Sequence, residues 1–260
     1  MGKIEAAVQK IYKECGMFDP LDLPIEDVIR SKNILLKDEK MDGCHGRILP
    51  HKDSAIITIN SKIEFDTRRK FVMAHEFGHF ILHRHNKKMF QDNAETLNQW
   101  YHEAFGLEEI EANEFAAEFL MPAEIFSDEC NGEIFTPEFI DYLADGFEVS
   151  KTAAILRFVK HGNYPVCVIY CKDNKMKWFK SSDDWKYYIE FERDQHPPTG
   201  SVAYELFTSN TIYTGNDRQQ PIKKSTWIRL NKFNDWDSDF YEYCLFVPSY
   251  NYSISVIWED

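Results

Sequence analysis

The amino-acid sequence predicts an α+β fold, in which a mainly helical first domain with a small sheet precedes a β-rich C-terminal domain. Apolar residues recur at helical spacing in three segments, residues 4–14, 66–83 and 107–120. Short runs typical of strands lie between the first two of these, at 34–36 and 55–59. After Gly162 short apolar runs alternate with polar turns, so we expect domains at 1–162 and 163–260.

The beginning of the chain predicts two helices ahead of the strands. Ile4, Val8 and Ile11 share one stripe of the first helix. Pro24 suits the first turn of a second, short helix that continues to Ile29. A turn at 51–53 precedes the second strand.

The segment 66–83 predicts the central helix. Phe71, Gly78 and Leu82 recur there at helical spacing, and Asp66 is suited to cap its N-terminus. Polar residues dominate 86–105, which predicts a loop or a loosely held helix. The strongly helical segment 107–120 follows and ends at a Met-Pro pair.

Residues 136–161 predict a helical hairpin with helix-turn-helix character. Thr136 and Pro137 are suited to be the N-cap and first residue of its first helix, and its second helix follows Ser150. We assign this hairpin to the first domain, where we expect it to pack on the core. The C-terminal domain then shows six runs with strand character, at 166–170, 177–179, 187–191, 226–230, 243–247 and 253–258.

Composition excludes several classes of protein. The chain has 43 acidic and 30 basic residues, a formal charge of −13, which repels nucleic-acid phosphates and argues against direct nucleic-acid binding. Its apolar runs are far shorter than a membrane span. The first residues show no export signal, and the six cysteines are scattered, so we expect a cytoplasmic protein with reduced thiols.

The pattern His75-Glu76-Phe77-Gly78-His79 indicates a metal centre. On a helix, residues four apart leave the same face one turn apart, so His75 and His79 can bind one ion. Glu76 is turned about 100° from His75, where it can reach a water beside the metal and act as a general base. Burying two imidazoles and a carboxylate in an apolar helix without a function would be costly.

A catalytic zinc ion needs a third protein ligand, and residues 107–120 offer several acids. Glu109 shares a face with the small residues Ala112, Asn113 and Ala116, and such a face could approach Gly78 closely. We therefore favour Glu109, with Glu111 as the second candidate and Glu108 as the third. His83 lies one turn beyond His79, too far along the helix axis to share the ion.

These two segments together resemble the ImmA/IrrE family of metallopeptidases. The resemblance rests on residues 69–79 and on 109–122, which read RKFVMAHEFGH and EIEANEFAAEFLMP. It implies a zincin-like domain with one Zn²⁺ per chain, and it places the third ligand four residues before Asn113, at Glu109. Longer members have a sensor-like C-terminal domain, which implies a sensory or regulatory role for 163–260 here.

The resemblance also implies a function and a partner. Members of the family cut helix-turn-helix repressors and so release stress or mobile-element genes, which predicts a protein substrate of that kind and a role in transcription regulation. The strand at 55–59 could align an extended substrate segment if it lies at the sheet edge. Tyr101 and His102 are positional candidates for oxyanion support. The alternative is a DNA-binding or protein-binding regulator with a structural or degenerate zinc site.

Overall fold

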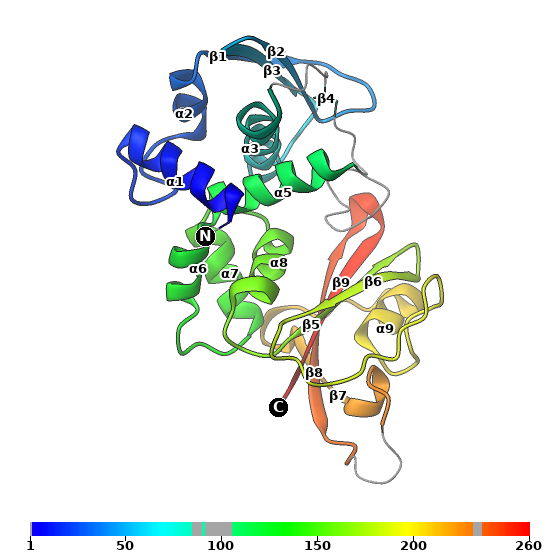
Figure 1. The fold of residues 1–260 in the computed structure, drawn as a ribbon. Helices are drawn as coiled ribbons and strands as arrows, with labels where there is room; N and C mark the ends of the chain where they lie inside the picture. The colour runs from blue at the N-terminus through cyan, green and yellow to red at the C-terminus, as the bar shows by residue number, and fades with distance from the viewer. Residues whose placement is uncertain (1, 85–89, 92–105, 231–235) are drawn as a thin grey trace. The chain divides into compact units, whose positions relative to one another are not determined.

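The computed structural model describes residues 2–84, 90–91, 106–230 and 236–260, whose contacts form two compact units. Unit 1 comprises Met1–Phe126 and Asp145–Ser150, and unit 2 comprises Ser127–Ala144 and Lys151–Asp260. Helices and strands occur in both, and the C-terminal part is rich in strands (Figure 1), so the predicted α+β class is confirmed. Among the described helices, none combines the length and the apolar character that crossing a membrane requires.

The helices of unit 1 follow the predicted periodicity. They are α1 (Lys3–Cys15), α2 (Ile25–Ser31), α3 (Asp66–His83), α5 (Leu107–Leu120) and α6 (Ala123–Glu129), of which the last three residues are assigned to unit 2. The cap prediction for α3 is wrong. Phe65 occupies the N-cap position and Asp66 is the first helical residue, where its carboxylate lies near the positive end of the helix dipole.

The sheet of unit 1 has four strands in the order β1-β3-β2-β4. They are β1 (Ile34–Glu39), β2 (Gly46–His51), β3 (Ser54–Asn60) and β4 (Phe90–Gln91). β3 pairs in parallel with β1 and antiparallel with β2, so it is an inner strand. The expectation that residues 55–59 could receive a substrate at a sheet edge is therefore wrong, because both edges of β3 are already paired.

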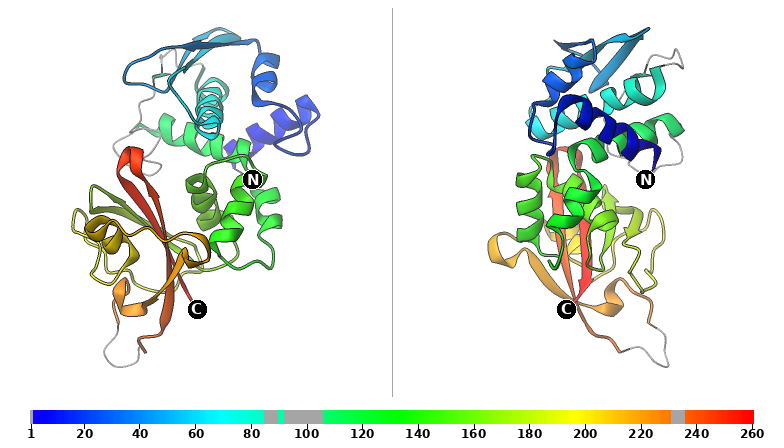
Figure 2. Two further views of the ribbon diagram at one scale, coloured as in Figure 1. Left: turned by 180° about the vertical axis from the view of Figure 1, so that it is seen from behind. Right: turned by 60° about the vertical axis from the view of Figure 1, so that its left-hand side comes forward.

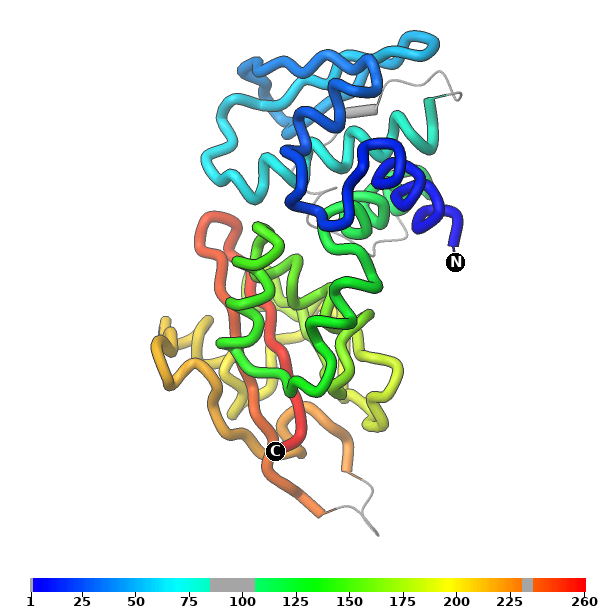
Figure 3. Tube along the Cα trace, turned by 90° about the vertical axis from the view of Figure 1, so that its left-hand side faces the viewer, coloured from blue at the N-terminus to red at the C-terminus, as the bar shows by residue number. Residues whose placement is uncertain are grey.

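Helix α3 lies between this sheet and helix α5 (Figures 1 and 2). Helix α1 packs beside α5, as the chain trace also shows (Figure 3). The α3 residues facing these neighbours are fully buried, from Val72 to His79. Of the segment 86–105, the structure describes only β4, so the loop-or-helix prediction for its other residues lies outside the described part, as do Tyr101 and His102.

Unit 2 is built on a five-stranded antiparallel sheet of order β6-β5-β9-β8-β7. Its strands are β5 (Cys167–Lys172), β6 (Lys175–Ser181), β7 (Gln219–Lys223), β8 (Asp239–Val247) and β9 (Tyr252–Glu259). Its helices are α7 (Pro137–Gly146, whose last two residues belong to unit 1), α8 (Lys151–His161) and α9 (Val202–Ser209), with short 3-10 turns at Gly215–Asp217, Lys224–Thr226 and Pro248–Tyr250.

Two predicted strands of unit 2 are wrong. Residues 187–191 and 226–230 form no strand and share only an isolated bridge between Ile189 and Ile228. Helix α9 and strand β7 were not predicted. A buried carboxylate anchors α9 to the sheet, because Glu242 of β8 accepts hydrogen bonds from the backbone N–H groups of Val202 and Ala203, at 3.0 and 3.1 Å. Burial raises the pKa of Glu242, although these hydrogen bonds oppose the shift.

The helical hairpin packs on the sheet of unit 2. The Thr136 cap is confirmed, since its hydroxyl accepts the Phe139 N–H at 3.0 Å. The Phe135 ring lies 5.3 Å from that of Phe158 and 4.8 Å from that of Trp258 on β9. The contacts thus place the hairpin helices with the C-terminal sheet, which differs from the grouping that we expected. That the residues after the boundary near 162 have a function of their own stays a prediction.

Candidate metal centre

Helix α3 carries most of the candidate site. It is covered on one side by the sheet of unit 1 and on another by α5. His75 and Glu76 are completely buried, and His79 is 1% exposed. A cluster of three phenylalanines joins α3 to α5, with the Phe77 ring 5.7 Å from Phe115 and 5.8 Å from Phe119. This packing holds the first turn of α5 beside the two histidines.

The contact between Gly78 and α5 differs from the one that we predicted. Ala112 and Ala116 are indeed completely buried. The side chain that meets Gly78 is however Phe115, since a Cβ added at Gly78 would lie 3.0 Å from the Phe115 ring. A side chain at position 78 would therefore require Phe115 to shift by a few tenths of an ångström.

His75, His79 and Glu109 offer donor atoms that all lie within 4.8 Å of one another. The Nε2 atoms of the two histidines are 3.0 Å apart. The Glu109 carboxylate approaches them at 3.3 Å from His75 and 3.5 Å from His79. Within the part of the chain that the structure describes, this is the one cluster of such donors close enough to share an ion.

The opposite ring nitrogens of the two histidines have partners of their own. His75 Nδ1 lies 2.9 Å from the Asn113 side-chain oxygen, which accepts a hydrogen bond from it. His79 Nδ1 lies 3.2 Å from His83 Nδ1, and His83 Nε2 lies 2.7 Å from Glu111. When both Nδ1 atoms carry protons, both Nε2 atoms present lone pairs to the same point.

This donor set fits a metal cation. Two lone pairs 3.0 Å apart beside a carboxylate repel one another unless a positive charge lies among them. Two imidazoles and one carboxylate are a ligand set of catalytic zinc sites, which leave a position open for water or substrate. Burial opposes ionisation of Glu109, but the neighbouring His75 and His79 outweigh it and hold its pKa well below the usual range.

Glu76 lies directly beneath strand β2. A Cβ added at Gly46 would come within 2.5 Å of the Glu76 carboxylate and 2.6 Å of Val72. A glycine at this position is therefore what lets the strand pass over Glu76.

The structure thus brings His75, His79 and Glu109 together, with Glu76 adjacent on α3. It places Glu111 on His83 instead, and Glu108 is not in the donor cluster. Sequence reasoning missed Asn113 as a partner of His75 and Gly46 as a neighbour of Glu76. The position of Asn113, one turn after Glu109, could have indicated the first, but Gly46 had no such signal.

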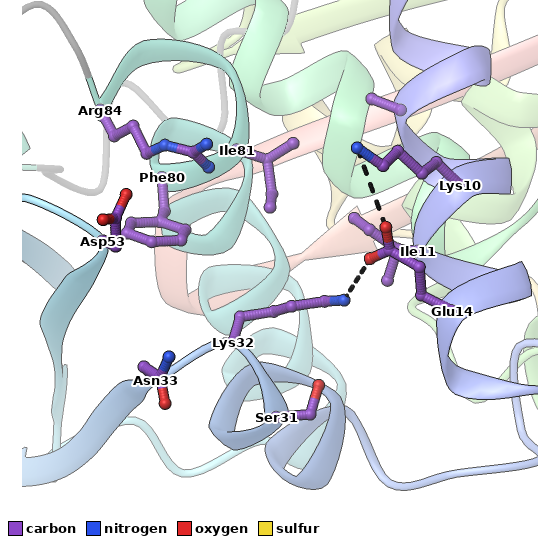
Figure 4. A pocket seen from close by; sticks show the side chains of 11 residues that line it. Lys10, Ile11, Glu14, Ser31, Lys32, Asn33, Asp53, Phe80, Ile81 and Arg84 are labelled. Atoms are coloured by element: carbon purple, nitrogen blue, oxygen red, sulfur yellow. Dashed lines mark hydrogen bonds and ion pairs between the residues drawn. The ribbon is translucent and has the colours of Figure 1, made fainter.

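A hollow in unit 1 is lined by residues other than these donors (Figure 4). It measures about 490 Å³ and lies among α1, α2 and the end of α3. Glu14 pairs there with Lys10 of the same helix at 3.8 Å and with Lys32 at 2.6 Å, and the second pair connects α1 to the end of α2. None of the candidate metal ligands lines it.

The chain is similar to a solved structure in fold and to a protein family in sequence. A solved structure of a Mycobacterium tuberculosis transcriptional regulator shares the fold, with a TM-score of 0.60 and 14% identity over 100% of this chain and 77% of that one. No curated protein sequence matches the chain. The family model described as the IrrE N-terminal-like domain, a peptidase family, matches residues 30–159, which include every member of the candidate centre. The chain therefore belongs to the IrrE N-terminal-like family, whose membership suggests a metallopeptidase.

Proposed function

We propose that this chain is a zinc-dependent endopeptidase in which His75, His79 and Glu109 hold one zinc ion. The observation that carries the proposal is the convergence of these three donors within 4.8 Å, beside a completely buried Glu76, in a member of a peptidase family. Three protein ligands leave one tetrahedral position for water or substrate.

The chemistry follows from the positions of the side chains. Zinc, when bound, activates an attacking water and polarises the scissile carbonyl. Glu76 acts as the general base that takes the proton of the water and delivers it to the leaving amine. Asn113 holds the His75 ring through its 2.9 Å contact, and the buried α3–α5 packing keeps Glu109 in place.

The close approach of β2 leads to a first prediction. Gly46→Ala should lower the rate of hydrolysis about tenfold or more, because the new methyl group displaces the Glu76 carboxylate from its position. Zinc content should stay near that of the wild type, since no proposed ligand is touched. Gly146→Ala is the matched control, because a Cβ there meets nothing within 4 Å. Equal peptidase rates for both variants would contradict the role given to Gly46.

A helix-turn-helix repressor is the substrate class that we propose. It follows from the ImmA/IrrE resemblance, and the solved structure with the same fold is described as a transcriptional regulator. The charge of −13 favours encounter with a basic DNA-binding partner. Cleavage of such a repressor would release stress or mobile-element genes, and it would take place in the cytoplasm.

The alternative, in which the α7–α8 hairpin binds DNA itself, receives less support from the side chains. Arg157 is only 5% exposed, and Lys151 pairs with Asp141 at 2.7 Å. Of the three Lys and Arg residues of α8, Lys160 alone is exposed. A helix with its basic residues buried or paired has little charge left for phosphates.

The experiment is to mix the zinc-loaded protein with a helix-turn-helix repressor encoded in the same genome and to follow cleavage by mass spectrometry. We expect one zinc-dependent cut in a linker of the repressor and poor activity on generic peptides. Glu76→Gln is the inactive control. Digestion of casein without any cut in the repressor would point instead to a general peptidase and would overturn the proposed substrate.

A further inference from the structure

His83 and Glu111 extend the metal centre into a chain of hydrogen bonds. His83 follows His79 by one turn of α3 and is 4% exposed. Its Nδ1 lies 3.2 Å from His79 Nδ1, and its Nε2 lies 2.7 Å from a carboxylate oxygen of Glu111 on α5. The contacts therefore run from one helix to the other, and they end on a candidate zinc ligand.

The order of these groups determines where the protons lie. A carboxylate only accepts hydrogen bonds, so the Nε2 atom of His83 must carry the proton that Glu111 receives. The Nδ1 atom of a neutral His83 then has a lone pair, which accepts the proton borne by His79 Nδ1. His79 Nε2 is left with its lone pair, 3.5 Å from Glu109 and 3.0 Å from His75 Nε2.

We propose that His83 and Glu111 are positioning residues that set the tautomer and the ring orientation of His79 for metal binding. The inference rests on the proposed zinc centre. Histidine ligands usually donate their second N–H to a carboxylate, a carbonyl or a water. Here His83 accepts the hydrogen bond of His79 directly. Glu111 supplies the negative charge through its contact with His83. The other ligand is oriented differently, because His75 meets the neutral amide of Asn113.

Glu111 has a second contact that provides a control. Its other carboxylate oxygen lies 3.7 Å from Nζ of Lys3, a residue whose side chain is 68% exposed. An ion pair at such a site contributes little. Lys3→Ala therefore disturbs Glu111 on its solvent side and leaves the contact with His83 in place.

The test is zinc affinity, measured on zinc-free protein by titration against a competing chelator. His83→Leu should weaken zinc binding about tenfold to a hundredfold, the usual effect of losing such a supporting group. His83→Asn returns an acceptor oxygen close to the position of Nδ1 and should recover part of the affinity. Glu111→Gln should fall between His83→Leu and the wild type, and Lys3→Ala should match the wild type.

The outcomes separate this inference from the proposed function. A wild-type protein that binds no zinc refutes the metal centre itself. A wild type that binds zinc, with His83→Leu binding equally well, overturns the positioning role and leaves the peptidase proposal standing. Equal weakening in His83→Leu and His83→Asn, with unchanged unfolding temperatures of the zinc-free proteins, would show that packing rather than the hydrogen bond matters and would also overturn it.

Discussion

Glu76→Gln is expected to stop hydrolysis while the protein keeps its zinc and its fold. The amide has the shape of the carboxylate and fits the same completely buried position, but it cannot accept the proton of the attacking water. General base catalysis contributes a factor of about 10² to 10⁴, so the rate should fall at least a hundredfold. Cleavage of the repressor, zinc content and the unfolding temperature are the measurements.

The matched control for this variant is Glu114→Gln. Glu114 is exposed on α5, so the same chemical change there should leave the cleavage rate unaltered. A Glu76→Gln protein with wild-type activity would refute the general-base role. A Glu76→Gln protein that has lost its zinc would mean that Glu76 supports the metal rather than the reaction.

The second large effect concerns the ligands. His75→Ala or His79→Ala should abolish stoichiometric zinc, because each removes one of three protein donors. Glu109→Ala should weaken binding severely, and more than Glu111→Ala does, since Glu111 contacts His83 rather than the donor cluster. Treatment of the wild type with a chelator should stop cleavage, and added zinc should restore it. Zinc per chain, determined by elemental analysis, is the measurement.

One result would refute the assignment of Glu109 as the third ligand. If Glu109→Ala keeps full zinc occupancy while Glu111→Ala loses it, the third ligand has been placed two residues too early. The geometry would then have to change on zinc binding, because Glu111 now lies 2.7 Å from His83.

Periodicity predicted the helices that carry the centre. The segments 66–83 and 107–120 coincide with α3 and α5, because apolar residues recur at helical spacing through the whole of each. Strand β2 was missed because Gly46 and Pro50 read as turn residues, although the strand is held by its pairing with β3. Residues 187–191 have strand-forming side chains, but only Ile189 finds a bridging partner.

The candidate site, too, could be predicted from the sequence only in part. Spacing alone places His75, Glu76 and His79 on one helix, since all three lie within five residues of the chain. The choice of Glu109 needed a face argument and a family resemblance, because α5 presents several acids. The contacts of Gly46 with Glu76 and of Asn113 with His75 join segments 30 and 38 residues apart, which no local pattern reports.

The path of the chain between the two units has a practical consequence for dissecting the protein. The chain passes from unit 1 to unit 2 after Phe126, returns for Asp145–Ser150 and leaves again at Lys151. A fragment ending at residue 162 would retain α8 but lack the strand that carries Trp258, and the ring of Phe135 would lose its contact with Trp258. Such a fragment would expose apolar surface and tend to aggregate. Its inactivity would therefore not show that the sheet acts as a sensor. Point substitutions within the 260-residue chain are the sound way to separate the contributions of the two units.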